Sequence, residues 1–355
     1  MAEKHESCNR VKARRQNRGW PQEELARRAG ISRTAVSAIE VGRIVPSVAA
    51  ALSLAAALGC TVEELFGGPS PPPGRPEWAW PPGREPSRYW HAEVGGRTLL
   101  YPVEPGLLGA VAHDGIAREG RFASEGEFPP QQTLVIACCD PAAGLLAAEY
   151  ARASGFRLLV LPRSSGQALS LLGSGLVHVA GIHLATAEDA EGNAKAVRGH
   201  VSEPMNLLRV ARWEEGLVLD PTVSASTVGE ALQARLSWVG REPGSGARRC
   251  LDQLRPSRPA PRRVAYDHRG VAEAIRCGWA EAGVCLRLAG EEAGLRFLGI
   301  QVESYDLCYP QSAEADPRIQ ALVRVVRERR YRKLIGELPG YDAADAGEIE
   351  RVIVG

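Results

Sequence analysis

The sequence predicts a multidomain protein with an all-α head, a small β segment and a larger α/β domain. Three observations support this prediction. Residues 8–66 carry apolar side chains at helical spacing. Residues 69–88 contain eight prolines, which cannot continue a helix and favour an extended spacer. From Thr133 onward, short apolar runs alternate with helical patterns, as in domains built on a largely parallel sheet.

The composition is that of an ordinary globular protein, with 45% hydrophobic and 24% charged residues among 355. The net charge is +1, but residues 1–67 hold ten basic and seven acidic side chains, so this end carries +3 and the rest −2. A positive end suits a DNA-binding head, although the excess is small. The predicted boundaries are 1–67 for the head, 68–88 for a Pro-rich linker, 89–130 for the β segment and 131–355 for the α/β domain.

Targeting signals are not evident in the sequence. No apolar stretch reaches the roughly 18 residues of a membrane span, and the highly charged N-terminal segment has no apolar region typical of a secretory signal. We therefore expect a cytoplasmic protein that does not contact a membrane. The eight cysteines show no CxxC spacing, so reduced thiols are expected. Cys138 and Cys139 are adjacent, but nothing near them in the sequence clearly lowers a thiol pKa, which disfavours a redox sensor.

The two larger segments differ in their strand patterns. In the β segment, aromatic and aliphatic residues alternate with glycines, and Val94-Gly95-Gly96-Arg97 indicates a hairpin turn. The α/β domain begins with the run TLVIACC at residue 133 and contains two successive units of alternating strands and helices. Residues 255–263 are expected to form an exposed loop in the second unit. The last helix is expected from about Pro317 to Leu334.

The head contains two predicted helices joined by a tight turn. The first begins at Gln22, and Gly30 supplies the left-handed position that ends it. Ser32 is an N-cap for the second helix. The inward faces carry Leu25, Ala26, Ala29, Val36 and Ile39, and the outer face of the second helix carries Arg33, Thr34, Ser37 and Ala38. Short polar side chains with one arginine at a helix N-terminus suit base edges in the major groove.

This head resembles the Cro/repressor-type (XRE) helix-turn-helix family. The resemblance covers residues 8–67 and rests on WPQEELARRAGISRTAVSAIEVGRIVPS, continued by LSLAAALGCTVEELF. It implies a homodimer on a near-palindromic double-stranded DNA operator. The implied DNA-contacting residues are Gln22 at a phosphate, Arg33, Thr34 and Ser37 at bases, and Ser32 and Arg43 beside them. Pro21 departs from the Ser or Thr cap usual in the family, and a helical bundle for protein contact is the alternative.

Polar residues and glycines follow several predicted strands of the α/β domain. In such domains, ligands bind beyond the carboxyl ends of the strands, where helix N-termini meet. Helix N-termini with Ser and Gly hold an anion without a formal positive charge. Five such loops follow successive predicted strands in this order along the chain, and together they predict a cleft between two lobes. The candidate residues are Cys139, Asp140, Ser164, Ser165, His183, Ser245, Gly246, Arg248 and Tyr305.

The order of these loops resembles the molybdate-binding-like branch of the type II periplasmic-binding-protein fold. The resemblance rests on CCDPAAGLL (138–146), SSGQAL (164–169), VHVAGIHL (177–184), ARWEEGLVLDP (211–221), REPGSGAR (241–248) and ESYDL (303–307). It implies a chain that leaves the first lobe near Trp213 and returns near Tyr305. It also implies a tetrahedral oxyanion held by Ser164, Ser165, Ser245 and Tyr305 and by the amides of Cys139 and Gly246.

Some residues depart from that pattern. The carboxylate of Asp140 would repel a bound dianion, so Asp140 is interpreted as a helix cap; otherwise Arg163, His183 or Arg248 would offset its charge. His183 is equally compatible with a core histidine bonded to a carbonyl. The resemblance makes molybdate or tungstate the first ligand candidate, and these departures leave a small organic anion or cofactor precursor as the second. An adaptor protein with a degenerate cleft is a further alternative for the function.

Enzyme motifs are not found in the sequence. We find no GxSxG, HExxH or GxxxxGK[ST], and no GxGxxG after a strand. We therefore expect a ligand-responsive regulator that is not an enzyme and has no catalytic cofactor or metal site. The expected mechanism is ligand-linked closure of the two lobes, which requires the ligand to bind the open and closed forms differently.

Overall fold

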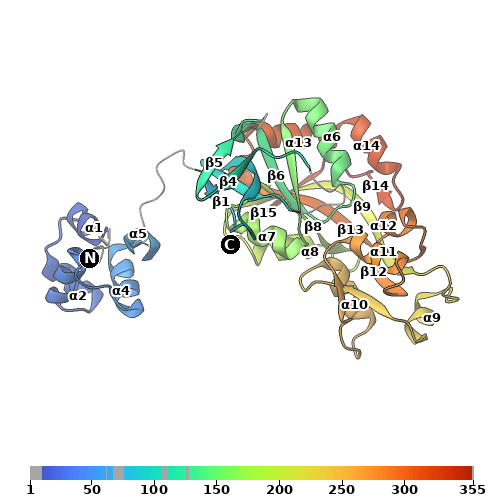
Figure 1. Cartoon of the computed structure of the whole chain (residues 1–355), viewed down its shortest axis with the longest axis horizontal. Helices are drawn as coiled ribbons and strands as arrows, with labels where there is room; N and C mark the ends of the chain where they lie inside the picture. Colours follow the sequence, from blue (N-terminus) through green and yellow to red (C-terminus); the bar gives the residue numbers. More distant parts are fainter. Residues whose placement is uncertain (1–9, 61, 67–75, 105–110, 125–127, 354–355) are drawn as a thin grey trace. The chain divides into compact units, whose positions relative to one another are not determined.

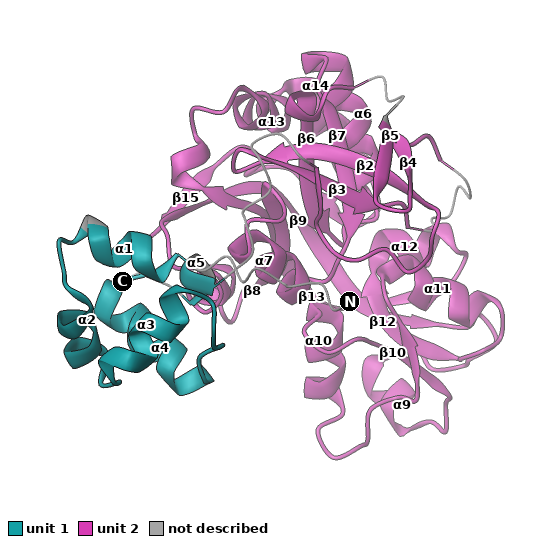
Figure 2. Cartoon of the chain, turned by 60° about the vertical axis from the view of Figure 1, so that its left-hand side comes forward, with its two compact units in different colours: residues 1–75 teal, residues 76–355 magenta. Residues whose placement is uncertain are grey.

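The computed structural model describes residues 10–60, 62–66, 76–104, 111–124 and 128–353. The contacts divide the chain into two compact units, residues 1–75 and 76–355, which Figure 2 colours separately. We call the first unit the head and the second the body, and describe each by itself. None of the described helices combines the length and the apolar character needed to cross a membrane.

The described part of the head is helical. Its helices are α1 (Val11–Asn17), α2 (Gln22–Ala29), α3 (Arg33–Glu40), α4 (Val48–Leu58) and α5 (Val62–Phe66). The five residues predicted to face inward are all buried in one core with Leu54 and Leu58. Gly30 ends α2 with a φ of 65°, and Ser32 Oγ accepts a hydrogen bond of 3.1 Å from Ala35 N–H at the start of α3. The predicted helix-turn-helix is therefore confirmed.

A small five-stranded sheet opens the body. Its strands are β1 (Glu77–Trp78), β2 (Ser87–Val94), β3 (Arg97–Pro102), β4 (Gly115–Arg118) and β5 (Arg121–Ser124), in the order β1-β3-β2-β4-β5. Val94 pairs with Arg97 across Gly95 and Gly96, whose φ values of 57° and 75° fit the predicted hairpin turn. β1 and the start of β2 lie inside residues 68–88, so the second half of the predicted linker is part of the sheet and not a free spacer. Residues 67–75 lie outside the described residues.

Polar contacts join this sheet to the rest of the body. Arg157 forms a largely buried ion pair of 2.6 Å with Asp114. Tyr101 Oη donates a hydrogen bond of 2.7 Å to the carbonyl oxygen of Leu176. Arg157 begins a strand of the large sheet, so the small sheet packs against that sheet within one compact unit.

The first lobe is built on parallel strands covered on both faces. Its elements are η1 (Pro130–Gln132), β6 (Thr133–Cys138), α6 (Ala143–Ser154), β7 (Arg157–Pro162), α7 (Ser165–Gly173), β8 (Val179–Thr186), α8 (Gly192–Arg198), η2 (Gln311–Ala313), α13 (Pro317–Arg327), α14 (Arg329–Gly336), β14 (Tyr341–Asp342) and β15 (Ile349–Val352). β6 is parallel to both β7 and β8. Every residue of β6 is buried, because α6, α13 and α14 pack on one face and α7 and α8 on the other (Figure 1).

One predicted helix is divided in the structure. The sequence predicts a single helix from about Pro317 to Leu334, but the structure has α13 and α14 with Glu328 between them. Glu328 has an extended backbone, with a φ of −64° and a ψ of 135°, which interrupts the helical path. The two helices therefore change direction and follow the curved face of the sheet (Figure 1).

Two long strands connect the lobes. They are β9 (Met205–Leu219) and β13 (Arg296–Pro310), which pair antiparallel along almost their whole length. Their first-lobe halves contact β8 and β15, and their other halves continue into the sheet of the second lobe. Trp213 pairs with Glu303 and Ala211 with Tyr305 near the middle. The predicted exit near Trp213 and return near Tyr305 are therefore confirmed.

The second lobe repeats the layered arrangement. Its elements are α9 (Val228–Gln233), β10 (Trp238–Arg241), α10 (Gly246–Leu254), β11 (Arg263–Ala265), α11 (His268–Arg276), β12 (Ala282–Leu286) and α12 (Arg287–Glu292). β10 is parallel to β11 and β12, and β12 pairs with β9. Helices α9 and α10 cover one face, and α11 and α12 cover the other. The two-lobed α/β architecture is thus confirmed.

Candidate functional site

The ends of several strands face each other where the two lobes meet. A Cβ atom added to Gly166, in the first turn of α7, would stand 3.3 Å from the carbonyl oxygen of Gly244, which precedes α10. Arg249 of the second lobe donates a hydrogen bond of 2.6 Å to the carbonyl oxygen of Leu184 in the first. The lobes are therefore closed on each other, and the side chains at the strand ends are buried between them.

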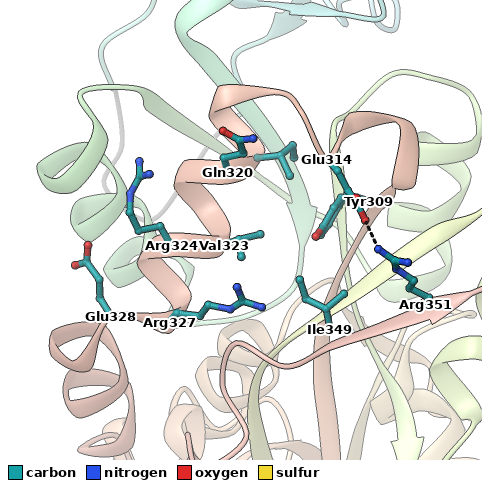
Figure 3. Close-up of a pocket in the computed structure, with 10 residues that line it drawn as sticks. Tyr309, Glu314, Gln320, Val323, Arg324, Arg327, Glu328, Ile349 and Arg351 are labelled. Atoms are coloured by element: carbon teal, nitrogen blue, oxygen red, sulfur yellow. Dashed lines mark ion pairs between the residues drawn. The ribbon is translucent and has the colours of Figure 1, made fainter.

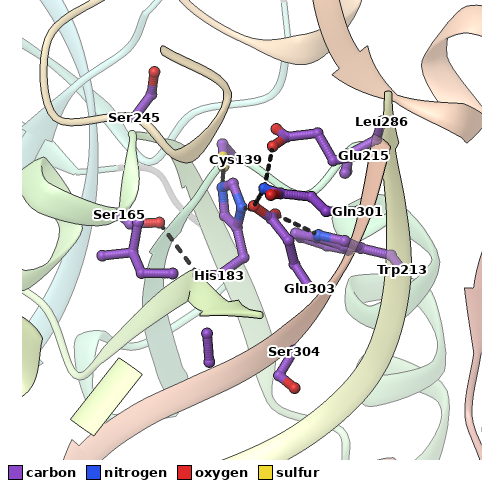
Figure 4. A network of polar contacts seen from close by, with 12 residues as sticks. Cys139, Ser165, His183, Trp213, Glu215, Ser245, Leu286, Gln301, Glu303 and Ser304 are labelled. Carbon is purple, nitrogen blue, oxygen red and sulfur yellow. Dashed lines mark hydrogen bonds and ion pairs between the residues drawn. The ribbon is translucent and has the colours of Figure 1, made fainter. Parts of the chain in front are cut away.

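His183 is the centre of a polar network at this junction (Figure 4). It lies inside β8, not after it as the sequence predicts, and its imidazole is fully buried. Its Nδ1 lies 2.6 Å from Glu303 Oε2, and its Nε2 lies 3.1 Å from Cys139 Sγ. Its backbone N–H donates to Ser165 Oγ at 3.3 Å. Because a carboxylate accepts from Nδ1, Nε2 is the nitrogen left to face the sulfur.

Two glutamates from the crossover strands lie next to this histidine. Glu303 accepts hydrogen bonds from Trp213 Nε1 at 3.1 Å and from Gln301 Nε2 at 2.8 Å. Gln301 also donates to Glu215 Oε2 at 3.1 Å. Burial raises the pKa of Glu303 to about 7 and raises the pKa of Glu215 well above its usual range. The pair therefore retains a proton near neutral pH, which lowers the negative charge in the site.

His268 reaches the same sulfur from the second lobe. It is the first residue of α11, and its Nε2 lies 3.8 Å from Cys139 Sγ. Leu286 N–H donates to its Nδ1 at 3.3 Å. Burial, and then the nearby charge of Arg241, lower the pKa of His268 well below its usual value, so this imidazole is neutral. Cys139 therefore has one imidazole from each lobe beside it.

Arg241 is a buried cation with one free donor. Its side chain is 1% exposed, and its Nε and Nη2 hold Glu242 at 2.8 and 3.1 Å. Nη2 also donates to the carbonyl oxygen of Tyr266 at 3.2 Å. Its Nη1 is buried and has no hydrogen-bond partner among the described residues. An unpaired buried guanidinium nitrogen costs free energy, so it indicates where an acceptor from a ligand belongs.

Ser164 offers a second free donor in the first lobe. Ser164 is the N-cap residue of α7, and its backbone N–H donates to Gln167 Oε1 at 3.2 Å. Its hydroxyl is fully buried; its oxygen is the acceptor of a capping box with the backbone of Gln167, while its O–H donates to no partner among the described residues. Ser164 follows β7 in the first lobe and Arg241 is the last residue of β10 in the second, so each lobe has one unused donor at a strand end.

Comparisons with known proteins match this two-part organisation. A family model described as "PBP superfamily domain" matches residues 147–327, which is half of the chain. A helix-turn-helix model matches residues 11–65. The head is 40% identical over 58 residues to YgzD of Bacillus subtilis (strain 168), described as an uncharacterized HTH-type transcriptional regulator; the match covers 16% of this chain and 88% of that protein.

The chain belongs to the PBP superfamily and carries a helix-turn-helix head. From here on we call the body, residues 76–355, the PBP domain. Solved structures similar to its PBP domain include an ABC-type phosphate transport receptor from Vibrio cholerae, with 14% identity and a TM-score of 0.41 over 58% of this chain and 97% of that chain. Another is a binding protein component of an ABC phosphonate transporter from Pseudomonas aeruginosa, with 10% identity and a TM-score of 0.41, covering 62% of this chain and 81% of that chain. At this distance, neither indicates the ligand of this PBP domain.

Several of the predicted ligand residues meet in the PBP domain. Cys139, Ser165 and His183 are in contact, as described above. Gly246 packs on the same imidazole, because a Cβ atom there would stand 2.7 Å from His183 Cε1. Ser245 caps α10 by accepting from Arg248 N–H at 3.2 Å, and its hydroxyl donates to the carbonyl oxygen of Glu242.

Three predicted residues lie beside the network without joining it. Asp140 Oδ1 accepts from Tyr341 Oη at 2.6 Å and from Ala142 N–H at 2.8 Å, and burial raises its pKa to about 6. The contact with Ala142 is local, as the cap interpretation expects, but the N-cap position of α6 is Ala142 itself. Tyr305 is buried and stacks on Trp213 with ring centroids 4.4 Å apart, which corresponds to core packing. Arg248 is turned toward Asp252 on the same helix at 2.8 Å.

The residues that the prediction missed are charged or polar groups on other strands and on one helix. His268, Glu215, Gln301 and Glu303 form the network with the predicted residues, and the charge of Arg241 acts on Cys139 from nearby. Glu215 offers a weak signal in the sequence, because it is an acidic residue directly before the apolar run that ends its strand. His268 carries no such signal, because it follows a short strand and looks like an ordinary residue in a helix start.

A hollow lies on the PBP domain away from the junction between the lobes (Figure 3). Its volume is about 660 Å³, and it is open between α13 and the strands β13 and β15. Arg324, Arg327 and Ile349 line it, together with an ion pair of 3.7 Å between Arg351 and Glu314. It shares no residue with the strand-end network, so it is not part of the junction between the lobes.

Proposed function

We propose that this chain is a transcriptional regulator whose PBP domain closes around a small oxyanion and thereby changes DNA binding by the head. The observation that carries the proposal is the pair of free buried donors, Arg241 Nη1 and Ser164 Oγ, at the closed junction. Both groups can donate to an anion oxygen. The start of α7 and the start of α10 meet at the same junction, and helix N-termini favour an anion.

Molybdate or tungstate is the first ligand candidate. A tetrahedral oxyanion fits a site with hydroxyl and amide donors, and the raised pKa values of Glu215, Glu303 and Asp140 reduce the repulsion that their carboxylates would exert. A small organic anion or cofactor precursor is the second candidate, since a carboxylate accepts equally well from a guanidinium. The free donors argue against a degenerate cleft in an adaptor protein.

The head provides the proposed DNA contacts. Ser32, Arg33, Thr34 and Arg43 are exposed, and Ser37 is half-buried on the same face of α3. Gln22 donates to Glu40 at 2.9 Å, so its amide is held at the start of α2. We propose that these residues bind a double-stranded operator.

We propose that a second copy of the chain covers an exposed aliphatic patch next to α3. The patch consists of Val41, Ile44, Val45, Val48 and Leu52, all of which are exposed. Clustered exposed aliphatic side chains are typical of interaction surfaces. A homodimer on a near-palindromic site, located in the cytoplasm with the DNA, follows from this proposal. Binding of the ligand, not its chemical conversion, is the proposed task of the PBP domain.

Substitution of Ser164 tests the anion site. Its O–H donates to no partner among the described residues, but its oxygen is the acceptor of a capping box at the start of α7, so the free energy of unfolding of Ser164→Ala is measured beside its affinity. Loss of one donor to a charged ligand, worth about 1.5–3 kcal/mol, predicts at least a tenfold loss of oxyanion affinity. The measurement is calorimetric titration of the full chain with molybdate, tungstate and sulfate. Ser170→Ala is the matched control, because Ser170 is exposed on the same helix.

Two results would contradict the oxyanion proposal. One is the absence of binding of all three anions to the wild-type chain. The other is equal affinity of the Ser164→Ala and Ser170→Ala variants. Arg241→Lys provides an independent variant, because it keeps the positive charge and removes the Nη1 donor.

A further inference from the structure

Cys139, His183 and His268 place three ligand atoms of a kind that transition metals prefer in one small volume. Cys139 Sγ and one nitrogen of each imidazole all lie within 4.8 Å of one another, and the three residues are buried. We propose that these side chains bind a divalent transition-metal ion, with Zn²⁺ as the first candidate, and that the ion links the two lobes. This inference goes beyond the proposed function and does not depend on which anion binds.

The distances fit a tetrahedral ion. Typical Zn–S and Zn–N bonds of about 2.3 Å and 2.05 Å place a sulfur and a nitrogen ligand about 3.6 Å apart at the tetrahedral angle. In the structure, Cys139 Sγ lies 3.1 Å from His183 Nε2 and 3.8 Å from His268 Nε2. The two sulfur–nitrogen distances lie on either side of the tetrahedral one, and the two imidazole nitrogens lie within 4.8 Å of each other, so small shifts of the histidine side chains would bring all three atoms into coordination.

The hydrogen bonds around His183 resemble those of a metal-bound histidine. Metal-bound histidines usually donate their other ring N–H to a carboxylate or carbonyl, which fixes the ring and its tautomer. His183 Nδ1 lies 2.6 Å from Glu303 Oε2. Glu303 is held in turn by Trp213 and Gln301 (Figure 4). The Nε2 lone pair is thereby directed at Cys139 and is available to an ion.

His268 requires one rearrangement. In the described conformation, Leu286 N–H donates to its Nδ1 at 3.3 Å. A metal on Nε2 places the remaining ring proton on Nδ1, so this hydrogen bond is lost. At 3.3 Å this N–H···N bond is longer than the 3.0 Å bond from Val135 N–H to His178 Nδ1, whereas a metal–imidazole bond is strong. We therefore expect the ion to displace the contact with Leu286.

The kinds of ligand atom indicate which metal binds, and the lobes that supply them indicate what binding does. A thiolate with imidazoles selects Zn²⁺ and similar metals over Mg²⁺ or Ca²⁺, which prefer oxygen ligands. Cys139 and His183 belong to the first lobe, and His268 begins α11 in the second. An ion with all three ligands requires closed lobes. The sequence analysis predicts no metal site, because the three ligands are far apart in the chain and form no spaced motif.

Cobalt provides a direct test, because Co²⁺ reports its own ligands in the absorption spectrum. The full chain is stripped with a chelator and titrated with Co²⁺, with no oxyanion present. We expect one equivalent to bind with a thiolate-to-cobalt charge-transfer band and strong d–d bands, and Zn²⁺ to displace it. Cys139→Ser should abolish the charge-transfer band, whereas Cys277→Ser, at an exposed cysteine, should keep it.

A second pair of variants tests the link between the lobes. His268→Gln should weaken Co²⁺ at least tenfold and reduce the rise in Tm that Zn²⁺ causes, whereas His200→Gln, at an exposed histidine, should change neither. The proposal is overturned if the wild type shows no charge-transfer band at one equivalent, or if Cys139→Ser retains it. Equal behaviour of His268→Gln and His200→Gln would overturn the link between the lobes. Because no oxyanion is added, failure of the anion proposal would not affect these outcomes.

Discussion

Gly246 is the residue at which closure of the PBP domain leaves least room. A Cβ atom there would stand 2.7 Å from His183 Cε1 and 2.9 Å from His183 Nδ1, closer than real side-chain contacts allow. The histidine cannot move away easily, because Glu303 and Ser165 hold it. We therefore expect Gly246→Ala to keep the lobes apart and to lower oxyanion affinity at least tenfold, as measured by calorimetry.

A glycine in the other lobe provides the control for this prediction. Gly144 lies near the start of α6, and a Cβ atom there would meet nothing within 4 Å. Gly144→Ala should bind oxyanions like the wild type. Gly166→Ala, whose Cβ would stand 3.3 Å from the carbonyl oxygen of Gly244, should show a smaller loss than Gly246→Ala. Wild-type affinity in Gly246→Ala would show that the closed junction is not the binding form.

The residues of the site were predictable from the sequence only where their roles are local. The sequence predicts a local capping contact for Asp140, which bonds the backbone two residues on. It predicts Ser245 only as a ligand residue, whereas the structure has Ser245 as the N-cap of α10. The contact between His183 and Glu303 joins β8 to β13, which are 120 positions apart. Such pairs depend on strand order and register, which one sequence does not specify.

Among the elements of the head, α1, α2 and α3 are tied together by Glu40. Arg15 Nε lies 2.6 Å from Glu40 Oε1, and Gln22 donates to Glu40 Oε2 at 2.9 Å. The Glu40 side chain is 1% exposed and that of Arg15 is 10% exposed. Removing one partner of a buried ion pair leaves an uncompensated charge and typically costs about 3–5 kcal/mol. Glu40→Gln should therefore destabilise the head by roughly 3 kcal/mol.

Amide hydrogen exchange of α2 and α3 measures this loss in the head alone. Glu24→Gln is the control, because Glu24 pairs with Arg27 and Arg28 at the surface, where a salt bridge is worth about 1 kcal/mol or less. Equal protection of these amides in the two variants would mean that the Glu40 pair does not stabilise α2 and α3.

The regular elements were the predictable part of the fold. Helical spacing in the head and continuous apolar runs such as β6 follow from which faces are buried, and both predictions are confirmed. The short strand β1 and the break at Glu328 were missed. β1 is only two residues long, and it exists because it pairs with β3. The break depends on the curvature of a sheet that the helices cover.

At the scale of the whole PBP domain, the two lobes share the crossover strands and a small number of polar contacts. One is the hydrogen bond from Arg249 to Leu184, and another runs from Arg269 Nη2 to the carbonyl oxygen of Pro141 at 3.2 Å. A ligand shifts the equilibrium between the open and closed arrangements of the lobes only through its difference in affinity for the two forms. In the proposed function, unused donors at strand ends of both lobes, Ser164 and Arg241, would provide that difference by contacting the ligand in the closed form.

The small sheet is joined to the first lobe by His178, whose protonation should limit the stability of the body in acid. Its Nδ1 accepts a hydrogen bond of 3.0 Å from Val135 N–H in β6, and its Nε2 donates to the carbonyl oxygen of Glu93 in β2 at 2.8 Å. Only a neutral imidazole makes both bonds. Burial lowers the pKa of His178 to about 4, the charge of Arg318 adds to this effect, and Asp316 opposes it.

Between about pH 6.5 and pH 4, the unfolded chain therefore binds a proton at His178 that the folded chain does not, so the contribution of His178 to stability falls as the pH falls through this window. The raised pKa values of Asp140, Glu215 and Glu303 act in the opposite direction, so the effect of His178 is measured as a difference between variants. A shift of this size predicts that the His178 contribution falls by up to roughly 3 kcal/mol, measurable as the difference in free energy of unfolding in urea between the wild type and His178→Gln at pH 7, 6 and 5. His178→Gln should flatten this dependence, because glutamine can accept and donate without titrating. His200→Gln, at an exposed histidine, should keep it. If His178→Gln loses as much stability in acid as the wild type does, the junction between the sheet and the lobe is not the acid-sensitive element.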